Sequence, residues 1–270
     1  MIKDIKKEIY LLIYIFIITL SILSINIIRF NYKKINYINK KEKEQDTIEN
    51  QNKTQIIEET NRTYISEGFY YEELSNSLKI KITGKSFPIE FDDKYPKIEY
   101  EDLNHVVVKY YDLNNEIHDD GELIVNSKVA KEVTEIFYEL FLSEYAIEKI
   151  KLVEEYNADD ILSMEDNNTS AFNYRIVEDS DKISWHALGL AIDINPVYNP
   201  YILGQNIYPK EGIEYIDRDK EFIGKITNKD LAYKVFTKYG WKWGGNFINS
   251  KDYQHFYKEI YDNSIRERKG

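Results

Sequence analysis

The most apolar stretch of the chain lies close to its N-terminus. From Ile9 to Ile28 no residue carries a charge, and most side chains are Ile, Leu, Tyr or Phe. A helix of this length spans about 30 Å, which is the thickness of the hydrocarbon core of a bilayer. The run exceeds the apolar core of a cleavable signal, and the best cleavage site available is the stretch from Ser21 to Ser24, which contains no alanine. Residues 9–30 are therefore predicted to form an uncleaved transmembrane anchor, preceded by a cytoplasmic stub at 1–8.

The apolar pattern stops after this segment. The following sequence includes KKEKEQDTIENQNKTQ, where charges alternate with amides and neither Gly nor Pro occurs. Such a stretch cannot bury enough apolar surface to order itself and stays solvated. Residues 31–64 are therefore predicted to be a polar linker that holds a folded domain, residues 65–265, away from the membrane.

Within that domain, helical and alternating patterns are mixed. Helices are expected where apolar residues recur every three or four positions, and strands where β-branched and aromatic residues cluster. The expected helices cover 69–82, 129–141 with Asn126 or Ser127 as cap, and 231–239 between Asn228 and Gly240; the expected strands cover 106–111, 151–154 and 172–177. A polar loop, NADDILSMEDNNTS, separates the last two strands. Short strands mixed with a few helices indicate an α+β fold.

The first stretch with recognisable chemistry is SWHALGLAIDIN, residues 184–195. Its second half alternates, so that Leu190, Ile192 and Ile194 are expected to face a core while Asp193 points the other way. Gly189 supplies a turn through which His186 returns toward Asp193. The motif thus brings one imidazole and one carboxylate together.

A second motif, GWKWGGNF followed by DYQHF, supplies another pair, Asp252 and His255. Two neutral imidazoles and one carboxylate around Zn²⁺ leave an open fourth position, where a water is acidified. A closed structural zinc site usually needs cysteine, and this chain contains 0 Cys. The other two histidines, His105 and His118, lack such surroundings and are interpreted as surface or loop residues.

Composition narrows the functional classes further. The formal net charge is -11, which disfavours general binding to nucleic acid because the phosphate backbone is itself negative. The absence of cysteine excludes disulfides and thiolate metal ligands.

Together the two motifs, SWHALGLAIDIN and GWKWGGNF…DYQHF, resemble the signature of the zinc D-alanyl-D-alanine carboxypeptidases. That family includes the vancomycin-resistance enzymes and phage L-alanyl-D-glutamate endopeptidases. The resemblance extends from about Phe69 to Tyr261. It implies a small antiparallel sheet flanked by helices, one catalytic Zn²⁺ per chain, and peptidoglycan stem peptides as substrate.

The resemblance also implies roles for individual residues. His186, Asp193 and His255 match the zinc ligands, and Asp252 matches the general base. Arg175 matches the arginine that stabilises an oxyanion or a substrate carboxylate, although AFNYR differs from the SGYR setting of the vancomycin enzymes. Ser184 and Trp243 are the expected substrate contacts, although pocket wall and core is the favoured interpretation of Trp243.

The expected activity is that of a zinc D-alanyl-D-alanine carboxypeptidase. An L-alanyl-D-glutamate-type endopeptidase and a noncatalytic wall-binding module on the same fold are the alternatives. Because peptidoglycan lies outside the membrane, the domain is expected to be extracytoplasmic on a single-pass anchor. The count of Lys and Arg opposes this orientation, with Lys3, Lys6 and Lys7 before the span and six such residues soon after it. Long domains are translocated largely regardless of such charges.

Overall fold

The computed structural model describes residues 62–177 and 182–260. The expected anchor, and the expected linker up to residue 61, lie outside these residues. Within the described part, the helices are all too short or too polar to cross a bilayer. The first strand of the described part begins at Thr63.

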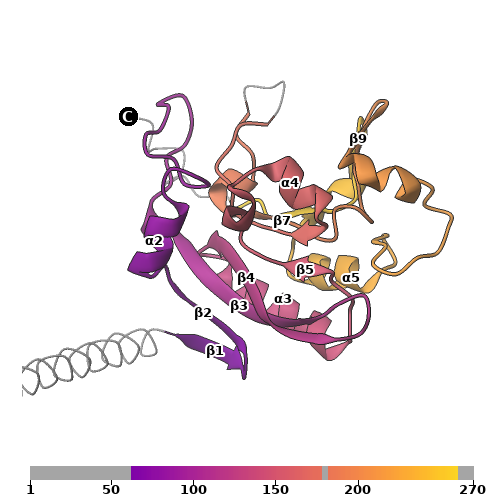
Figure 1. Cartoon of the computed structure of the whole chain (residues 1–270), viewed down its shortest axis with the longest axis horizontal. Helices are drawn as coiled ribbons and strands as arrows, with labels where there is room; N and C mark the ends of the chain where they lie inside the picture. The colour runs from indigo at the N-terminus through magenta and orange to yellow at the C-terminus, as the bar shows by residue number, and fades with distance from the viewer. Residues whose placement is uncertain (1–61, 178–181, 261–270) are drawn as a thin grey trace, which may run out of the picture. The chain divides into compact units, whose positions relative to one another are not determined.

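The first half of the domain is a four-stranded antiparallel sheet with strand order β1-β2-β3-β4 (Figure 1). Its elements are β1 (Thr63–Ser66), β2 (Phe69–Glu73), the helix α2 (Asn76–Ile82), the 3-10 turn η1 (Tyr100–Asp102), β3 (Leu103–Tyr111) and β4 (Ile117–Asn126). The two long strands β3 and β4 make the longest pairing of this sheet, in which β2 and β3 are the inner strands and β4 lies at one edge. The strand expected at 106–111 is confirmed as part of β3.

The helix expected over 69–82 is wrong in its first third. Residues Phe69–Glu73 form β2 and pair with β3, with Tyr70 opposite Val107. Aromatic side chains suit a half-buried pleated surface, and pairing with β3 outweighs the helical spacing. The helix starts only after Ser75, whose side chain accepts a hydrogen bond from the Leu78 amide at 3.2 Å.

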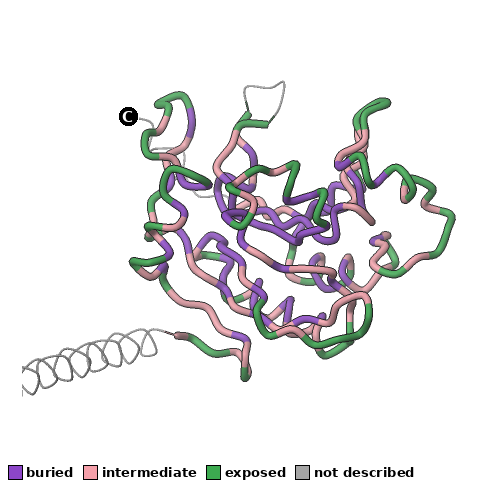
Figure 2. Tube along the Cα trace, in the orientation of Figure 1, coloured by how far each residue is buried: buried purple, intermediate pink, exposed green. Residues whose placement is uncertain are grey.

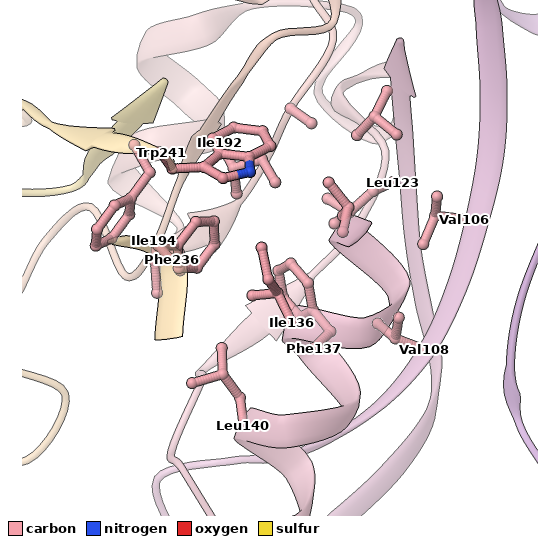
Figure 3. Packing of buried hydrophobic residues seen from close by; sticks show 14 of the residues in the cluster. Val106, Val108, Leu123, Ile136, Phe137, Leu140, Ile192, Ile194, Phe236 and Trp241 are labelled. Atoms are coloured by element: carbon pink, nitrogen blue, oxygen red, sulfur yellow. The ribbon is translucent and has the colours of Figure 1, made fainter. Parts of the chain in front are cut away.

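One face of the sheet is covered by the helix α3 (Ala130–Leu142), and their contact is the main core (Figure 3). The apolar residues of this contact are fully buried and come from β3, β4, α3 and the C-terminal part of the chain; they include Val106, Val108, Leu123, Ile136, Phe137, Leu140, Ile192, Phe236 and Trp241. The helix is confirmed, but its cap is not. Val129 occupies the N-cap position without a side-chain hydrogen bond, and the Asn126 side chain instead bonds the Leu188 carbonyl.

The second half of the domain is made of short pieces. They are β5 (Lys149–Ile150), η2 (Val153–Tyr156), α4 (Asp160–Glu165), β6 (Asn168–Thr169), η3 (His186–Leu188), β7 (Ala191–Asp193), β8 (Tyr201–Leu203), β9 (Asn206–Tyr208), η4 (Lys210–Tyr215), α5 (Leu231–Lys238), β10 (Lys242–Trp243), η5 (Gly244–Asn246), β11 (Lys251–Asp252) and β12 (His255–Tyr257). They form the sheets β10-β12-β7, β11-β8-β9 and the parallel pair β5-β6. Small sheets with few helices confirm the mixed α and β class.

Several expected elements of this half need correction. Residues 151–154 run into the 3-10 turn η2, and 172–177 form no strand beyond an isolated bridge between Ile176 and Ile183. The polar loop between them contains α4 and β6. The helix expected at 231–239 is confirmed as α5, but Asp230 caps it by accepting from the Ala232 amide at 2.8 Å, in place of Asn228.

Both remaining histidines lie in strands; the expected surface position holds for His118, whose side chain is 36% exposed, but not for His105. His105 lies within β3 between Glu72 and Glu122, at 3.5 and 3.0 Å, and its side chain is only 12% exposed. His118 lies in β4, 3.2 Å from Asp112. Neither is a loop residue, because each strand carries them within its hydrogen-bonded ladder.

Buried residues concentrate in the segments around β6, η3 and β7 (Figure 2). This band is unusual because much of it is polar. It includes Asn168, Thr169, Ser170, Asn173, Ser184, His186, Asp193, Asn195 and Asn199. Buried polar groups cost free energy unless they are paired, so a band of them indicates a functional site.

Candidate metal centre

His186 opens the turn η3 and is buried, with its ring held in one orientation. Its Nδ1 lies 2.5 Å from the carbonyl oxygen of Ala171. A carbonyl only accepts, so Nδ1 carries the proton and Nε2 keeps its lone pair. The Oγ of Ser184 accepts a hydrogen bond from the His186 amide at 3.2 Å. The turn and the Ala171 carbonyl therefore aim Nε2 at a fixed point.

Gly189 ends this turn in the left-handed conformation, with φ of +64°. A Cβ at this position would lie 2.5 Å from the Asn126 amide nitrogen and 2.9 Å from the Val125 carbonyl carbon. The absence of a side chain therefore allows η3 to approach the end of β4 closely, where Asn126 donates to the Gly189 carbonyl at 2.8 Å.

The other two donors face each other across an antiparallel strand pair. Asp193 of β7 lies directly opposite His255 of β12. His255 Nδ1 is 2.9 Å from Asp193 Oδ1 and 3.2 Å from His186 Nε2, and His186 Nε2 is 3.2 Å from Asp193 Oδ2. All three side chains are buried or nearly so. The three residues expected to be ligands thus converge on one point.

The spacing of these atoms fits a zinc ion. Tetrahedral Zn²⁺ with bonds of about 2.0–2.1 Å to nitrogen and oxygen places its ligand atoms roughly 3.3 Å apart. The observed separations of 2.9 to 3.2 Å lie close to this value. The Ala171 carbonyl fixes the tautomer of His186. Metal-binding histidines are commonly held in this way, by a hydrogen bond from the ring nitrogen that does not bind the metal.

The charges in the cluster are strongly coupled. Burial alone would raise the pKa of Asp193, but the adjacent histidines hold it well below its usual range. Burial lowers the pKa of His186, and the Asp193 carboxylate outweighs this effect and raises it. Asp193 therefore stays ionised, as a metal-binding carboxylate must be.

Asp252 lies in β11, opposite Tyr201 of β8, and is separated from His255 by two residues. Burial raises its pKa to about 7. Its Oδ1 is buried without a hydrogen-bond partner among the described residues. Gly244 makes room for it, because a Cβ there would lie 2.6 Å from the Asp252 carbonyl oxygen and 2.8 Å from its Cβ. The structure thus keeps a buried carboxylate with spare accepting capacity beside the three donors.

Arg175 lies close enough for its charge to depress the pKa of both His186 and Asp252. Its Nη2 forms an ion pair with Asp160 Oδ2 at 2.7 Å. Its Nε is buried without a partner among the described residues. Arg175 is therefore at the site, and one of its donors remains open.

The two expected substrate contacts are both buried. The Oγ of Ser184 accepts from the His186 amide, and the Ser184 amide donates to the carbonyl of Arg175 in the preceding segment. Trp243 packs edge to face on Tyr233, and its Nε1 donates to the Tyr253 carbonyl at 2.8 Å. Both side chains hydrogen bond the backbone of the segments that carry His186 and His255.

Sequence reasoning overlooked α4, which touches the site at two points. Asp160 pairs with Arg175, and Met164 Sδ lies 3.5 Å from Nε2 of Gln254, the residue before His255. The available signal was Asp159, a helix-capping residue followed by an apolar pair within a stretch interpreted as loop.

A second cluster of possible donors, Asp112, Glu116 and His118, lies at the turn between β3 and β4. Asp112 Oδ1 already accepts from the amides of Asn114 and Glu116, both at 2.8 Å. These bonds explain the acidic residue there as part of the turn.

Residues 178–258 match the family described as D-alanyl-D-alanine carboxypeptidase, which confirms the resemblance inferred from the two motifs. The matched region contains the three candidate metal donors and Asp252. Comparison with curated proteins and with solved structures gives no match.

Proposed function

We propose that this protein, whose residues 178–258 belong to the D-alanyl-D-alanine carboxypeptidase family, is a zinc peptidase that hydrolyses stem peptides of peptidoglycan. The observation that carries the proposal is the convergence of His186, Asp193 and His255 within 2.9 to 3.2 Å of one another. These three side chains would hold one zinc ion per chain and would leave a position open for chemistry.

When bound, the zinc ion supplies Lewis acidity, which makes a water more acidic and the scissile carbonyl more electrophilic. Asp252 then acts as the general base, accepting a proton from the attacking water and passing it to the leaving amine. Its burial and unpartnered Oδ1 suit this task. Arg175 donates to the oxygen on which negative charge develops, and its open Nε supports this role.

The bond we propose is the terminal D-alanyl-D-alanine bond, because the matching family is described by that activity. The alternative is the L-alanyl-D-glutamate bond within the stem peptide. A noncatalytic wall-binding module is a weaker candidate, because a binding module has no use for a buried base such as Asp252.

The experiment uses the purified full-length chain, its zinc content and a pentapeptide muropeptide substrate. Release of a single D-alanine, measured by mass spectrometry, is the expected result. Release of a peptide that begins with D-glutamate, with L-alanine left on the glycan, would identify the endopeptidase instead. A zinc-loaded protein that cuts neither bond would contradict the proposal.

We further propose that the domain lies outside the cell membrane on the N-terminal anchor, because its substrate is found there. Protease added to cells stripped of their wall should then degrade the domain and leave the anchor. Protection of the domain until the membrane is broken would contradict the extracytoplasmic placement.

A further inference from the structure

Helix α4 lies against the candidate site and contacts it through two side chains. Asp160, its first residue, forms the ion pair with Arg175, and Met164, one turn later, contacts Gln254 between Asp252 and His255. These contacts link α4 both to the cation at the site and to the segment that carries the base and the third donor. This six-residue helix is therefore connected to Arg175 and to the segment between Asp252 and His255.

The ion pair between Asp160 and Arg175 can orient the guanidinium but contributes little to the stability of the fold. Its nitrogen and oxygen are 2.7 Å apart, while the two side chains keep 26% and 33% of their surface exposed. Pairs that water reaches to this extent stabilise a fold very little. Their effect on the direction of a long, flexible side chain is not reduced in the same way, because one fixed nitrogen restricts the whole planar guanidinium.

The segment that carries Asp160 is itself held in place. The Asp159 side chain caps the helix by accepting from the Leu162 amide at 3.1 Å, and Ser163 Oγ bonds Asn168 Nδ2 at 3.0 Å. Asn173, two residues before Arg175, donates to the Ala158 carbonyl at 3.2 Å. Both partners of the ion pair are thus attached to the same hydrogen-bonded unit.

We infer that Asp160 is a positioning residue, which fixes Nη2 of Arg175 so that the open Nε meets the oxygen that becomes negative during hydrolysis. This inference rests on the proposed peptidase function. Asp160 takes up one donor of the guanidinium and leaves the buried Nε without an acceptor among the described residues, as a donor reserved for substrate would be. Asp160 acts through Arg175, which stabilises the transition state.

The test compares the full-length protein with its Asp160→Asn variant, which keeps the size of the side chain and removes its charge. Asp166→Asn is the matched control, because Asp166 ends the same helix and pairs with Lys149, away from Arg175. We expect kcat of Asp160→Asn to fall about tenfold to hundredfold with KM changed less than about twofold, since a misdirected group costs rate at this scale. Zinc content and melting temperature should match the unmodified protein, and Asp166→Asn should retain its kcat.

Two further variants test whether the effect passes through Arg175. Asp160→Glu restores the carboxylate and should recover part of the lost kcat. In a protein already carrying Arg175→Ala, adding Asp160→Asn should lower kcat no further, because there is no guanidinium left to direct.

The outcomes separate this inference from the proposed function. Cleavage by the unmodified protein together with an unchanged kcat in Asp160→Asn would overturn the positioning role alone. So would a full additional loss on the Arg175→Ala background, an equal fall in Asp166→Asn, or a change confined to KM. An unmodified protein that binds zinc and cleaves neither stem-peptide bond would overturn the proposed function, and the positioning role with it.

Discussion

Replacing Gly189 by alanine should destabilise the domain more than the same change at Gly204. Both glycines are left-handed, with φ of +64° and +61°, so both replacements carry the same backbone strain. That strain is about 1–2 kcal/mol, and it is partly offset by about 0.4–1 kcal/mol because alanine restricts the unfolded chain. Gly204 has nothing within 4 Å of the added Cβ, so its replacement measures strain alone.

At Gly189 the added methyl group meets backbone atoms at 2.5 and 2.9 Å. Backbone cannot rotate away, so η3 and the end of β4 must separate, and forced overpacking costs about 1–3 kcal/mol more. The assay is urea unfolding of both variants with zinc removed, so that metal binding does not mask the difference. For a domain of this size the extra loss corresponds to a melting temperature lower by about 2–12 °C.

The same displacement should weaken zinc binding, because His186 lies in the turn that Gly189 closes. The Gly204→Ala protein should bind zinc as the unmodified protein does. Equal unfolding free energies for the two variants would refute the reasoning, since they would show that the close approach at Gly189 is relaxed without cost.

Three other predictions follow from the site and its surroundings. His186→Ala should lose the bound zinc, while His118→Ala, which removes a histidine from the turn cluster, should keep it; elemental analysis of both proteins checks this. Asp252→Asn should retain zinc and lose about 10²- to 10⁴-fold in turnover, as expected for a missing general base, and a variant without zinc would show that ligand and base are exchanged. Burial lowers the pKa of His105, but Glu122 and Glu72 outweigh it and raise the pKa above 6.5, so the ion pairs stabilise the fold fully below that pH and progressively less as pH rises through the folded-state pKa. Thermal melts across neutral pH should therefore show this loss in the unmodified protein and a weaker dependence in His105→Gln; identical pH profiles would contradict it.

The sequence predicted well those features that a short stretch determines. The alternation around Ile192 correctly gave the strand β7, and the helical spacing of Ile136 and Leu140 correctly gave α3. Both patterns arise from one element packing on a core, and each can be recognised in a dozen residues. Capping was harder, because Asn126 has the side chain of a cap but uses it to bond the Leu188 carbonyl in another segment.

The errors occurred where distant parts of the chain decide the structure. Phe69–Glu73 became a strand because β3, more than thirty residues later, offers it a partner. The hairpin of β8 and β9 was not anticipated, although it pairs with the strand that carries Asp252. Asp160 was assigned to a loop because the capping signal of its short helix was overlooked and its partner, Arg175, comes after β6 in the sequence.

The pairing of β7 with β12 also determines when the three-donor cluster can exist during synthesis. His186 and Asp193 leave the ribosome before His255, which belongs to the last strand that the structure describes. A growing chain that ends before His255 has two donors and no third, and its β7 lacks the neighbour that fixes Asp193. The three-donor cluster is therefore completed in one late step, after nearly all of the described domain has been made.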